Sequence, residues 1–164
     1  MDKEKTAKNK QKSTILKRSL ARLMAIQILY QKDFANQEEV SIEVSKIKKD
    51  IIENYVLDCD QDISSYKDKI DEKFLDNLLG GVLQILPNLD QKISDNLKEG
   101  WEISSIDSTL LQIMRCGIFE LSYMKNIPSK VVVDEYVSIA ASFFDEKKVK
   151  FVNATLDKIA KSDQ

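Results

Sequence analysis

The 164-residue sequence contains no histidine at all. Histidine is the most common general base and the most common metal ligand, so its absence excludes histidine-dependent catalytic triads and two-histidine metal motifs. Glycine and proline are also scarce, with 4 and 2 residues, whereas a sheet-rich fold of this length would need many more turn residues. The composition therefore predicts an all-α protein without a histidine-dependent catalytic or metal site. We also expect no other catalytic residues, no metal site and no cofactor, so the protein is not expected to be an enzyme.

Cysteines and long apolar runs are equally sparse. Cys59 and Cys116 lie far apart and form no CxxC pair, a pattern typical of a reducing compartment without a disulfide framework. We expect Cys116 to be a small buried residue on a helix. No run approaches the roughly 18 apolar residues of a membrane span, and the polar N-terminus lacks the apolar stretch of a signal peptide. These absences predict a cytoplasmic protein.

Charge is distributed unevenly along the chain, although the total is only -2. Residues 1–22 hold eight basic residues against two acidic ones, a net charge of +6, so the remaining residues carry -8. Two of the three arginines, Arg18 and Arg22, lie in this basic stretch, while the chain has 22 lysines. The use of arginine rather than lysine at these two positions indicates that a planar guanidinium group is needed for contacts with phosphate and base. The basic stretch therefore favours nucleic acid as a partner over a merely solubilising role.

Hydrophobic residues recur with helical spacing in seven segments, and no segment is convincing as a strand. The acidic, aperiodic stretch 57–68 is expected to be a loop. Residues 1–13 are expected to form a flexible basic arm, followed by a single helical domain over residues 14–164. The expected helices span about 13–35, 38–56, 69–86, 87–100, 104–125, 129–144 and 148–160.

The first expected helix carries one regular apolar stripe. Its members alternate in steps of four and three residues, a spacing that predicts one buried face: Leu16, Leu20, Leu23, Gln27, Tyr30 and Phe34. At about 100° per residue, Arg18 and Arg22 lie on nearly the opposite side of the helix. We therefore expect both guanidinium groups on one exposed patch, where an anion would neutralise their mutual repulsion.

Two further features indicate packing rather than chemistry. Paired glycines inside a helix are destabilising, and without a preceding strand the Gly80-Gly81 pair favours close helix packing over a phosphate loop. Asp107 ends a Ser-Ser-Ile-Asp sequence that is typical of a helix N-terminus, so it is expected to act as a cap.

A series of short motifs extends over roughly residues 15–160. The N-terminal and middle motifs are Arg18-x-x-x-Arg22-x-x-Ala25-x-Gln27-x-Leu29-Tyr30, Leu78-Leu79-Gly80-Gly81-Val82, Ile106-Asp107 and Phe119-Glu120-Leu121. The later motifs are Ile127-Pro128-x-Lys130-Val131 and Phe151-Val152-Asn153-x-x-Leu156-Asp157-Lys158. In residue type and order, this set resembles the NusB family of bacterial transcription antitermination factors.

The resemblance implies both a fold and a function. It implies that the expected helices, about seven in number, form two packed helical subdomains around a shared core. Members of the family bind the boxA sequence of nascent RNA together with NusE, a small-subunit ribosomal protein. The pair joins a complex that lets RNA polymerase pass terminators, notably in ribosomal RNA operons. Some relatives self-associate, so a homodimer stays open.

The resemblance also implies which residues bind RNA. Arg18 and Arg22 are the first expected contacts, and Lys17 would add attraction to phosphate that weakens with salt. Lys150 and Phe151 are expected on the RNA surface as well. The Phe151 ring would either stack on a base or anchor the last helix.

Tyr30 and the thinned arginine motif leave alternatives open. Tyr30 lies at the edge of the apolar stripe, so it is expected either to contact NusE or RNA through its hydroxyl end or to serve packing alone.

The family's arginine-rich opening is reduced here to Arg18 and Arg22, which favours a second hypothesis, a helical protein-interaction module that has lost specific RNA binding. A third hypothesis is an RNA-binding domain detached from an RNA cytosine methyltransferase, because some of these enzymes carry a NusB-like domain.

Overall fold

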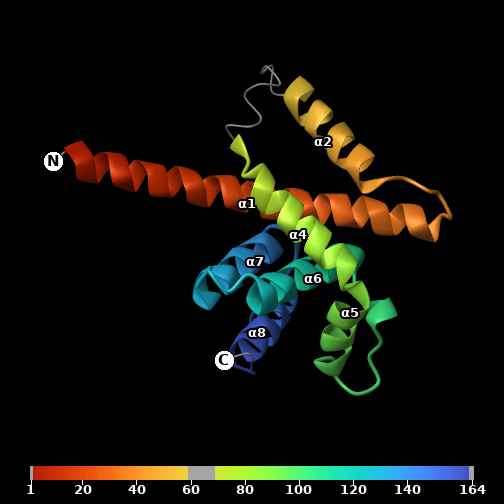
Figure 1. Cartoon of the computed structure of the whole chain (residues 1–164). Helices are drawn as coiled ribbons and strands as arrows, with labels where there is room; N and C mark the ends of the chain where they lie inside the picture. Colours follow the sequence, from red (N-terminus) through yellow and green to blue (C-terminus); the bar gives the residue numbers. More distant parts are fainter. Residues whose placement is uncertain (1, 59–68, 163–164) are drawn as a thin grey trace. The chain divides into compact units, whose positions relative to one another are not determined.

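The structure of the chain, a computed structural model, describes residues 2–58 and 69–162. Within these residues it consists of seven α-helices and one short 3-10 helix, with no strand (Figure 1). The all-α prediction of about seven helices is therefore confirmed. The elements are α1 (Asp2–Gln37), α2 (Val44–Asp58), α4 (Glu72–Gln84), α5 (Leu86–Asp95), η2 (Ile103–Ser105), α6 (Ser108–Tyr123), α7 (Ser129–Phe143) and α8 (Glu146–Ser162).

The largest difference from the predicted helix bounds is at the start of α1. This helix begins at Asp2 rather than at residue 13 or 14, because residues 2–37 are rich in good helix formers and contain no glycine or proline. Asp2 and Glu4 lie in the first turn, where acidic side chains interact favourably with the helix dipole. Of the expected loop, residues 57 and 58 belong to α2, and residues 59–68, including Cys59, lie outside the described residues.

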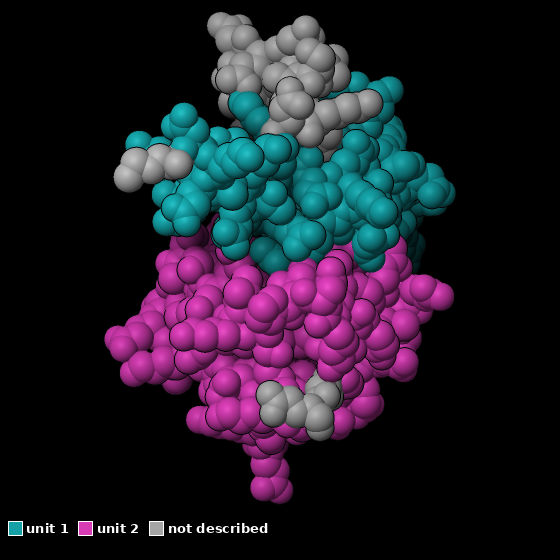
Figure 2. All heavy atoms as spheres, turned by 60° about the vertical axis from the view of Figure 1, so that its left-hand side comes forward, with its two compact units in different colours: residues 1–77 teal, residues 78–164 magenta. Residues whose placement is uncertain are grey.

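The chain divides into two compact units, residues 1–77 and 78–164 (Figure 2). Unit 1 contains α1, α2 and the first part of α4, and unit 2 contains the rest of α4 and α5 to α8. The expected arm over residues 1–13 and the expected single domain over 14–164 stay predictions. None of the described helices combines the length and the apolar character that a membrane crossing needs.

Helix α1 buries a different face from the predicted one. Apart from Arg22, the residues that it buries most completely are small or aliphatic, with exposed fractions of 3% or less: Ala21, Ala25, Ile26, Ile28 and Leu29. Members of the predicted stripe are largely exposed, with fractions of 65% at Leu16, 40% at Tyr30 and 56% at Phe34. The prediction that this stripe faces inward is therefore wrong, because α1 has two apolar faces and periodicity alone does not say which one is buried.

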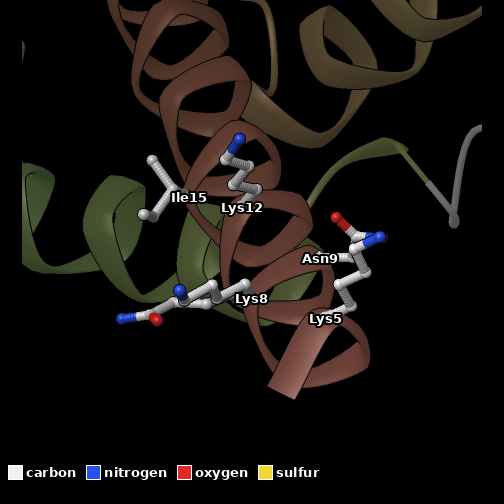
Figure 3. Close-up of a pocket in the computed structure, with 6 residues that line it drawn as sticks. Lys5, Lys8, Asn9, Lys12 and Ile15 are labelled. Carbon is white, nitrogen blue, oxygen red and sulfur yellow. The ribbon is translucent and has the colours of Figure 1, made fainter. Parts of the chain in front are cut away.

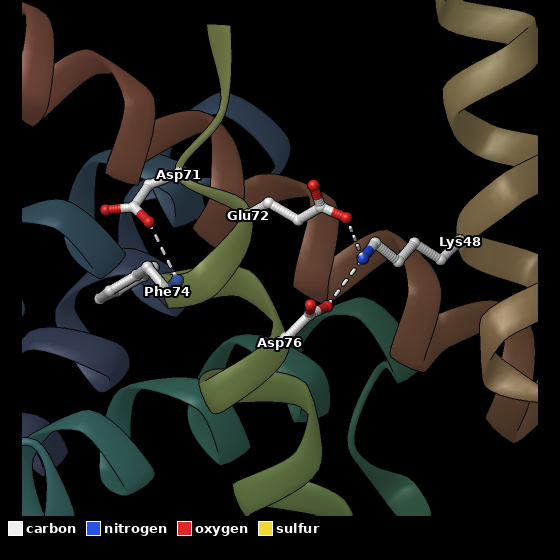
Figure 4. A network of polar contacts seen from close by, with 5 residues as sticks. All are labelled: Lys48, Asp71, Glu72, Phe74 and Asp76. Carbon is white, nitrogen blue, oxygen red and sulfur yellow. Dashed lines mark hydrogen bonds and ion pairs between the residues drawn. The ribbon is translucent and has the colours of Figure 1, made fainter. Parts of the chain in front are cut away.

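A cluster of ion pairs joins α2 to the start of α4 within unit 1. The Nζ atom of Lys48 lies 2.9 Å from Glu72 Oε1 and 2.8 Å from Asp76 Oδ1 (Figure 4). The two acidic residues are one helical turn apart, so their carboxylates reach the same ammonium group. Burial by itself lowers the pKa of Lys48. The hydrogen bonds that Lys48 donates to Asp76 and Glu72, together with the attraction of their negative charges, outweigh burial and raise the pKa above its ordinary value of 10.5.

The raised pKa of Lys48 predicts that this cluster weakens at alkaline pH. A cation whose pKa is raised by folding stabilises the fold below its ordinary pKa and loses that contribution as pH rises through the raised value. We expect the stability advantage of the wild type over Lys48→Gln to be full at about pH 8 and to shrink above about pH 10.5. Urea unfolding of both proteins across this pH range measures the difference. An advantage that stays constant at high pH contradicts the prediction.

Helix α6 forms the centre of unit 2, where it contacts α5, α7 and α8. Gly117 allows α8 to approach closely, since a Cβ at this position would lie 3.0 Å from Leu156 Cδ1. The helix starts at Ser108, four residues later than predicted. Asp107 caps it as expected, because its carboxylate accepts hydrogen bonds from the backbone N–H groups two and three residues later. Its completely buried apolar residues are Ile113, Met114, Cys116 and Ile118.

Polar side chains of α6 are buried only with partners. Arg115 makes a bidentate contact with Asp90 of α5, with Nε–Oδ1 and Nη2–Oδ2 distances of 2.7 and 2.8 Å. The Tyr136 hydroxyl of α7 donates a hydrogen bond to Glu120, and both residues are completely buried. Cys116 is buried as predicted, and burial raises the pKa of its thiol, which keeps the group protonated and unreactive.

Candidate nucleic-acid interface

The N-terminal part of α1 presents an exposed basic strip. Lys5, Lys8 and Lys12 recur every three or four residues, so their side chains project from one side of the helix. With Asn9, Gln11 and Ile15, these lysines line a shallow hollow on the helix surface (Figure 3). All lining residues come from this single helix, so the hollow is part of an open surface. Such a strip offers positive charge to a phosphate backbone without an enclosed pocket.

Further along α1, Arg18 and Arg22 both contact the ring of Phe74 in α4. Their guanidinium carbons lie 5.4 and 5.0 Å from the ring centroid, within the range of cation–π interactions. The Phe74 side chain is buried, with an exposed fraction of 5%. Two arginines one turn apart are thus held against one aromatic side chain.

Asp71 connects the same part of α1 to the start of α4. One carboxylate oxygen accepts a hydrogen bond from the Phe74 N–H at 3.0 Å and so caps α4 (Figure 4). The other oxygen lies 3.5 Å from Arg18 Nε, and the Asp71 N–H donates to the Lys17 carbonyl at 3.3 Å. Both predicted arginines therefore have a structural role in holding α1 against α4.

The two arginines differ in their accessibility to a ligand. Arg22 is only 2% exposed, so the prediction that it lies on an exposed patch is wrong. It follows Ala21 and precedes Ala25 on the buried side of the helix, where its aliphatic stem packs and its guanidinium meets Phe74. The Arg18 side chain keeps an exposed fraction of 34%, which leaves it within reach of solvent. An RNA contact by Arg22 stays a prediction, and it would require α1 and α4 to rearrange.

Lys17 and Tyr30 lie on accessible parts of α1. Lys17 is half-buried and adjoins Arg18, whereas Tyr30 is 40% exposed. At a rise of about 1.5 Å per residue, the two positions are roughly 20 Å apart along the helix. At about 100° per residue, they also project about 140° apart around the helix. Their expected roles, phosphate attraction for Lys17 and partner contact for Tyr30, therefore belong to separate regions of α1.

Lys150 and Phe151 lie on α8 in unit 2. Lys150 is exposed and pairs with Glu146 at 3.1 Å, and Phe151 is half-buried. Half-burial leaves both stacking and anchoring open for the Phe151 ring. Close by in sequence, the Lys148 ammonium lies 5.0 Å from the centroid of the Phe144 ring. A second basic and aromatic pair therefore adjoins the predicted residues of this unit.

The structure brings together only part of the predicted site. Lys17, Arg18 and Arg22 meet at the contact between α1 and α4 in unit 1, whereas Lys150 and Phe151 belong to unit 2. Among the described residues, no group of three or more acidic or cysteine side chains is arranged to hold a metal ion. The part of the site that the structure defines is therefore a basic surface of α1.

Two residues at the centre of this contact, Asp71 and Phe74, are absent from the sequence-based prediction. A local signal was present, because an aspartate three residues before an apolar residue that opens an amphipathic run is a typical N-cap. Its second role, the ion pair with Arg18, is a contact between distant segments. The sequence does not contain that information in a local pattern.

A family model and the curated relatives of this chain point to the same family. A family model described as the NusB family matches residues 19–161. The chain is 37% identical over 148 residues to the transcription antitermination protein NusB of Rhizobium leguminosarum bv. trifolii (strain WSM2304), which covers 90% of this chain and 88% of that protein.

Solved structures support the same assignment. A structure of T. maritima NusB matches with a TM-score of 0.68 and 27% identity, covering 88% of this chain and 90% of that chain. A structure of the antitermination factors NusB and NusE in complex with dsRNA matches in fold, with a TM-score of 0.68 and 22% identity over 88% of this chain and 96% of that chain. Because the family model spans most of the sequence and the curated relative matches at 37% identity, this chain belongs to the NusB family.

Proposed function

We propose that this protein is an RNA-binding transcription antitermination factor. It binds boxA-type nascent RNA together with NusE and helps RNA polymerase to read through terminators, notably in ribosomal RNA operons. Membership of the NusB family supports the antitermination role. The role places the protein in the cytoplasm and requires binding surfaces rather than catalytic groups.

The exposed lysines of α1 are the observation on which RNA binding rests. Lys5, Lys8 and Lys12 are exposed on one side of α1. They belong to residues 1–22, which have a net charge of +6. Lysines on a flexible stem supply phosphate attraction that is independent of base sequence. Arg18, whose side chain is 34% exposed, adds a planar guanidinium that can contact a base.

Selectivity in this proposal comes from joint binding of RNA and NusE. Each single contact is weak, and simultaneous binding of both partners gives useful affinity through a coupling free energy. Support for these partners comes from the matching structure in which a NusB protein is combined with NusE and dsRNA. Linkage requires that NusE tightens RNA binding by the same factor by which RNA tightens NusE binding.

The proposal predicts a salt-dependent loss of RNA binding when the lysine strip is neutralised. We expect the triple variant Lys5→Gln, Lys8→Gln, Lys12→Gln to bind boxA-like RNA more weakly. If each lysine contacts one phosphate, the slope of log affinity against log salt should fall in magnitude by about 2, since each contact to single-stranded RNA contributes about 0.7. Fluorescence anisotropy at several salt concentrations, with boxA-like and scrambled RNA, measures both quantities.

A matched control has the same change of net charge at other exposed lysines, Lys73, Lys130 and Lys158. This control should retain most of the affinity and of the salt slope. Equal losses in both triple variants would show that only the net charge matters. RNA affinity that does not change on addition of NusE would contradict the proposed coupling.

The burial of Arg22 bears on the alternative of an interaction module without RNA binding. With Arg22 at 2% exposure, fewer guanidinium groups are available to RNA than the motif suggests. That alternative predicts a flat salt response and equal binding of boxA-like and scrambled RNA in the titrations above. The variant Arg18→Gln is the appropriate arginine test, because changing Arg22 would also disturb the packing around Phe74.

A further inference from the structure

The Nε atom of Arg18 is an exception to the pairing of buried polar groups in this protein. Among the residues that the structure describes, it is the one buried side-chain nitrogen or oxygen without a hydrogen-bond partner. The Oδ2 atom of Asp71 lies 3.5 Å away, close enough for an ion pair, yet the contact is not a hydrogen bond. Buried polar groups in native proteins are nearly always hydrogen-bonded, so this exception needs an explanation.

The rest of the Arg18 side chain is accessible to a ligand. The side chain keeps an exposed fraction of 34% although its Nε atom is buried. Within the described part of the chain, its guanidinium contacts the Asp71 carboxylate on one side and the ring of Phe74 at 5.4 Å. A phosphate can therefore approach this guanidinium from solvent while the stem of the side chain stays in place.

Asp71 is held in position by contacts that do not involve Arg18. Its Oδ1 atom accepts a hydrogen bond from the Phe74 N–H at 3.0 Å, and its own N–H donates to the Lys17 carbonyl at 3.3 Å. The next carboxylates of this segment, those of Glu72 and Asp76, are paired with Lys48 instead. We therefore expect the Asp71 carboxylate to keep its place beside Arg18 whether or not a ligand is bound.

An RNA phosphate and Asp71 compete for the same guanidinium group. Arginine binds phosphate through two parallel N–H bonds, whereas a fixed carboxylate beside it offsets its positive charge and repels the phosphate. Because the Arg18 Nε atom has no hydrogen bond to Asp71, the side chain can turn towards a phosphate without losing one there. The ion pair is thus weak enough to be displaced, but its displacement lowers the net affinity.

We propose that Asp71 is a positioning residue that weakens RNA binding through Arg18. In the free protein, its carboxylate holds the guanidinium beside the ring of Phe74. In the complex, an RNA phosphate replaces Asp71 as the anion nearest to the guanidinium. This inference rests on the proposed RNA binding and adds to it the residue that limits the affinity of this part of α1. It predicts that removal of one negative side-chain charge strengthens the complex.

The substitution Asp71→Asn tests the proposal in the full chain. Asparagine and serine are as good N-caps as aspartate, so Asp71→Asn and Asp71→Ser should both keep the start of α4 and leave the melting temperature nearly unchanged. In fluorescence anisotropy with boxA-like RNA at low salt and without NusE, each should lower the Kd about two- to fivefold, the range of an exposed ion pair. The slope of log affinity against log salt should increase in magnitude by up to about 0.7.

The same substitution at Asp107 is a matched control. Asp107 caps α6 through the same kind of hydrogen bonds, and Asp107→Asn changes the net charge equally, so it should alter the Kd much less. The decisive measurement is Asp71→Asn in an Arg18→Gln background. There it should have no more effect than Asp107→Asn, because a purely structural role of Asp71 would not depend on the charge of Arg18. Arg18→Gln alone should weaken RNA binding.

The outcomes separate this inference from the proposed function. Unchanged or weaker RNA binding by Asp71→Asn, equal gains by the two aspartate variants, or a gain that persists without Arg18 each overturn the role of Asp71. In these cases the salt-dependent RNA binding of the wild type still supports the proposed function. A wild type that does not bind RNA overturns both.

Discussion

Replacement of Phe74 by alanine is expected to lower the free energy of unfolding by about 3–5 kcal/mol. The side chain is 5% exposed, so the substitution removes a large buried ring and leaves a cavity. It also removes the aromatic face that contacts the guanidinium groups of Arg18 and Arg22, each interaction contributing on the order of 1 kcal/mol. Urea unfolding followed by circular dichroism measures the change.

Two control variants separate the ring from simple loss of volume. Phe74→Leu keeps apolar volume but removes the π-face, so it should be less destabilising than Phe74→Ala. Phe143→Ala changes a phenylalanine that is 51% exposed and should lower stability far less. If Phe74→Ala and Phe143→Ala have equal effects, Phe74 does not hold α1 and α4 together in the way proposed.

Gly81→Ala is expected to destabilise the protein, whereas the neighbouring Gly80→Ala is expected to stabilise it. A Cβ at Gly81 would lie 2.0 Å from Phe119 Cζ, far inside contact distance, and Phe119 is itself stacked on Tyr123 at 5.3 Å. Forcing this ring aside should reduce stability by about 1–3 kcal/mol. At Gly80 nothing lies within 4 Å of the added methyl group, so the higher helix propensity of alanine should add about 0.5–1 kcal/mol.

The comparison of the two glycine variants contains its own control, because both gain the same helix propensity and differ only in their surroundings. Thermal unfolding of both variants beside the wild type is sufficient. A stabilised Gly81→Ala would mean that the Phe119 ring moves away without loss. In a Phe119→Ala background, Gly81→Ala should no longer be destabilising, since the clash is absent.

Local patterns in the sequence were sufficient for most helices and for the family. Pro128 ahead of α7 and Asp107 ahead of α6 mark helix starts that the structure has at Ser129 and Ser108, because capping depends only on the nearest residues. The paired glycines indicated close helix packing, which the structure shows at Gly81 but not at Gly80. A glycine pattern locates such a contact to within a residue, and the neighbouring helix decides which glycine is required.

The buried face of α1 could not be predicted in the same way. Two apolar faces run along this helix, and the more regular one, with Leu16 and Phe34, is exposed. The buried face consists of small side chains such as Ala21 and Ala25 together with Arg22. Alanine and arginine contribute little hydrophobicity, so this face gives only a weak signal in the sequence. Small residues allow close packing, and an arginine can be buried when its stem packs and its charge meets an aromatic ring and other partners.

The sequence by itself determined that the protein is helical, roughly where its helices lie, which family it belongs to and where its positive charge is concentrated. These properties depend on local helix propensity and capping, which are set by residues close together in the sequence, and on the composition of the chain. Only the tertiary structure decided that Arg22 is buried against Phe74, that Asp71 both caps α4 and pairs with Arg18, and that the regular stripe of α1 faces outward. Each of these depends on which distant segment packs against a helix, and that choice depends on the contacts of the folded chain as a whole.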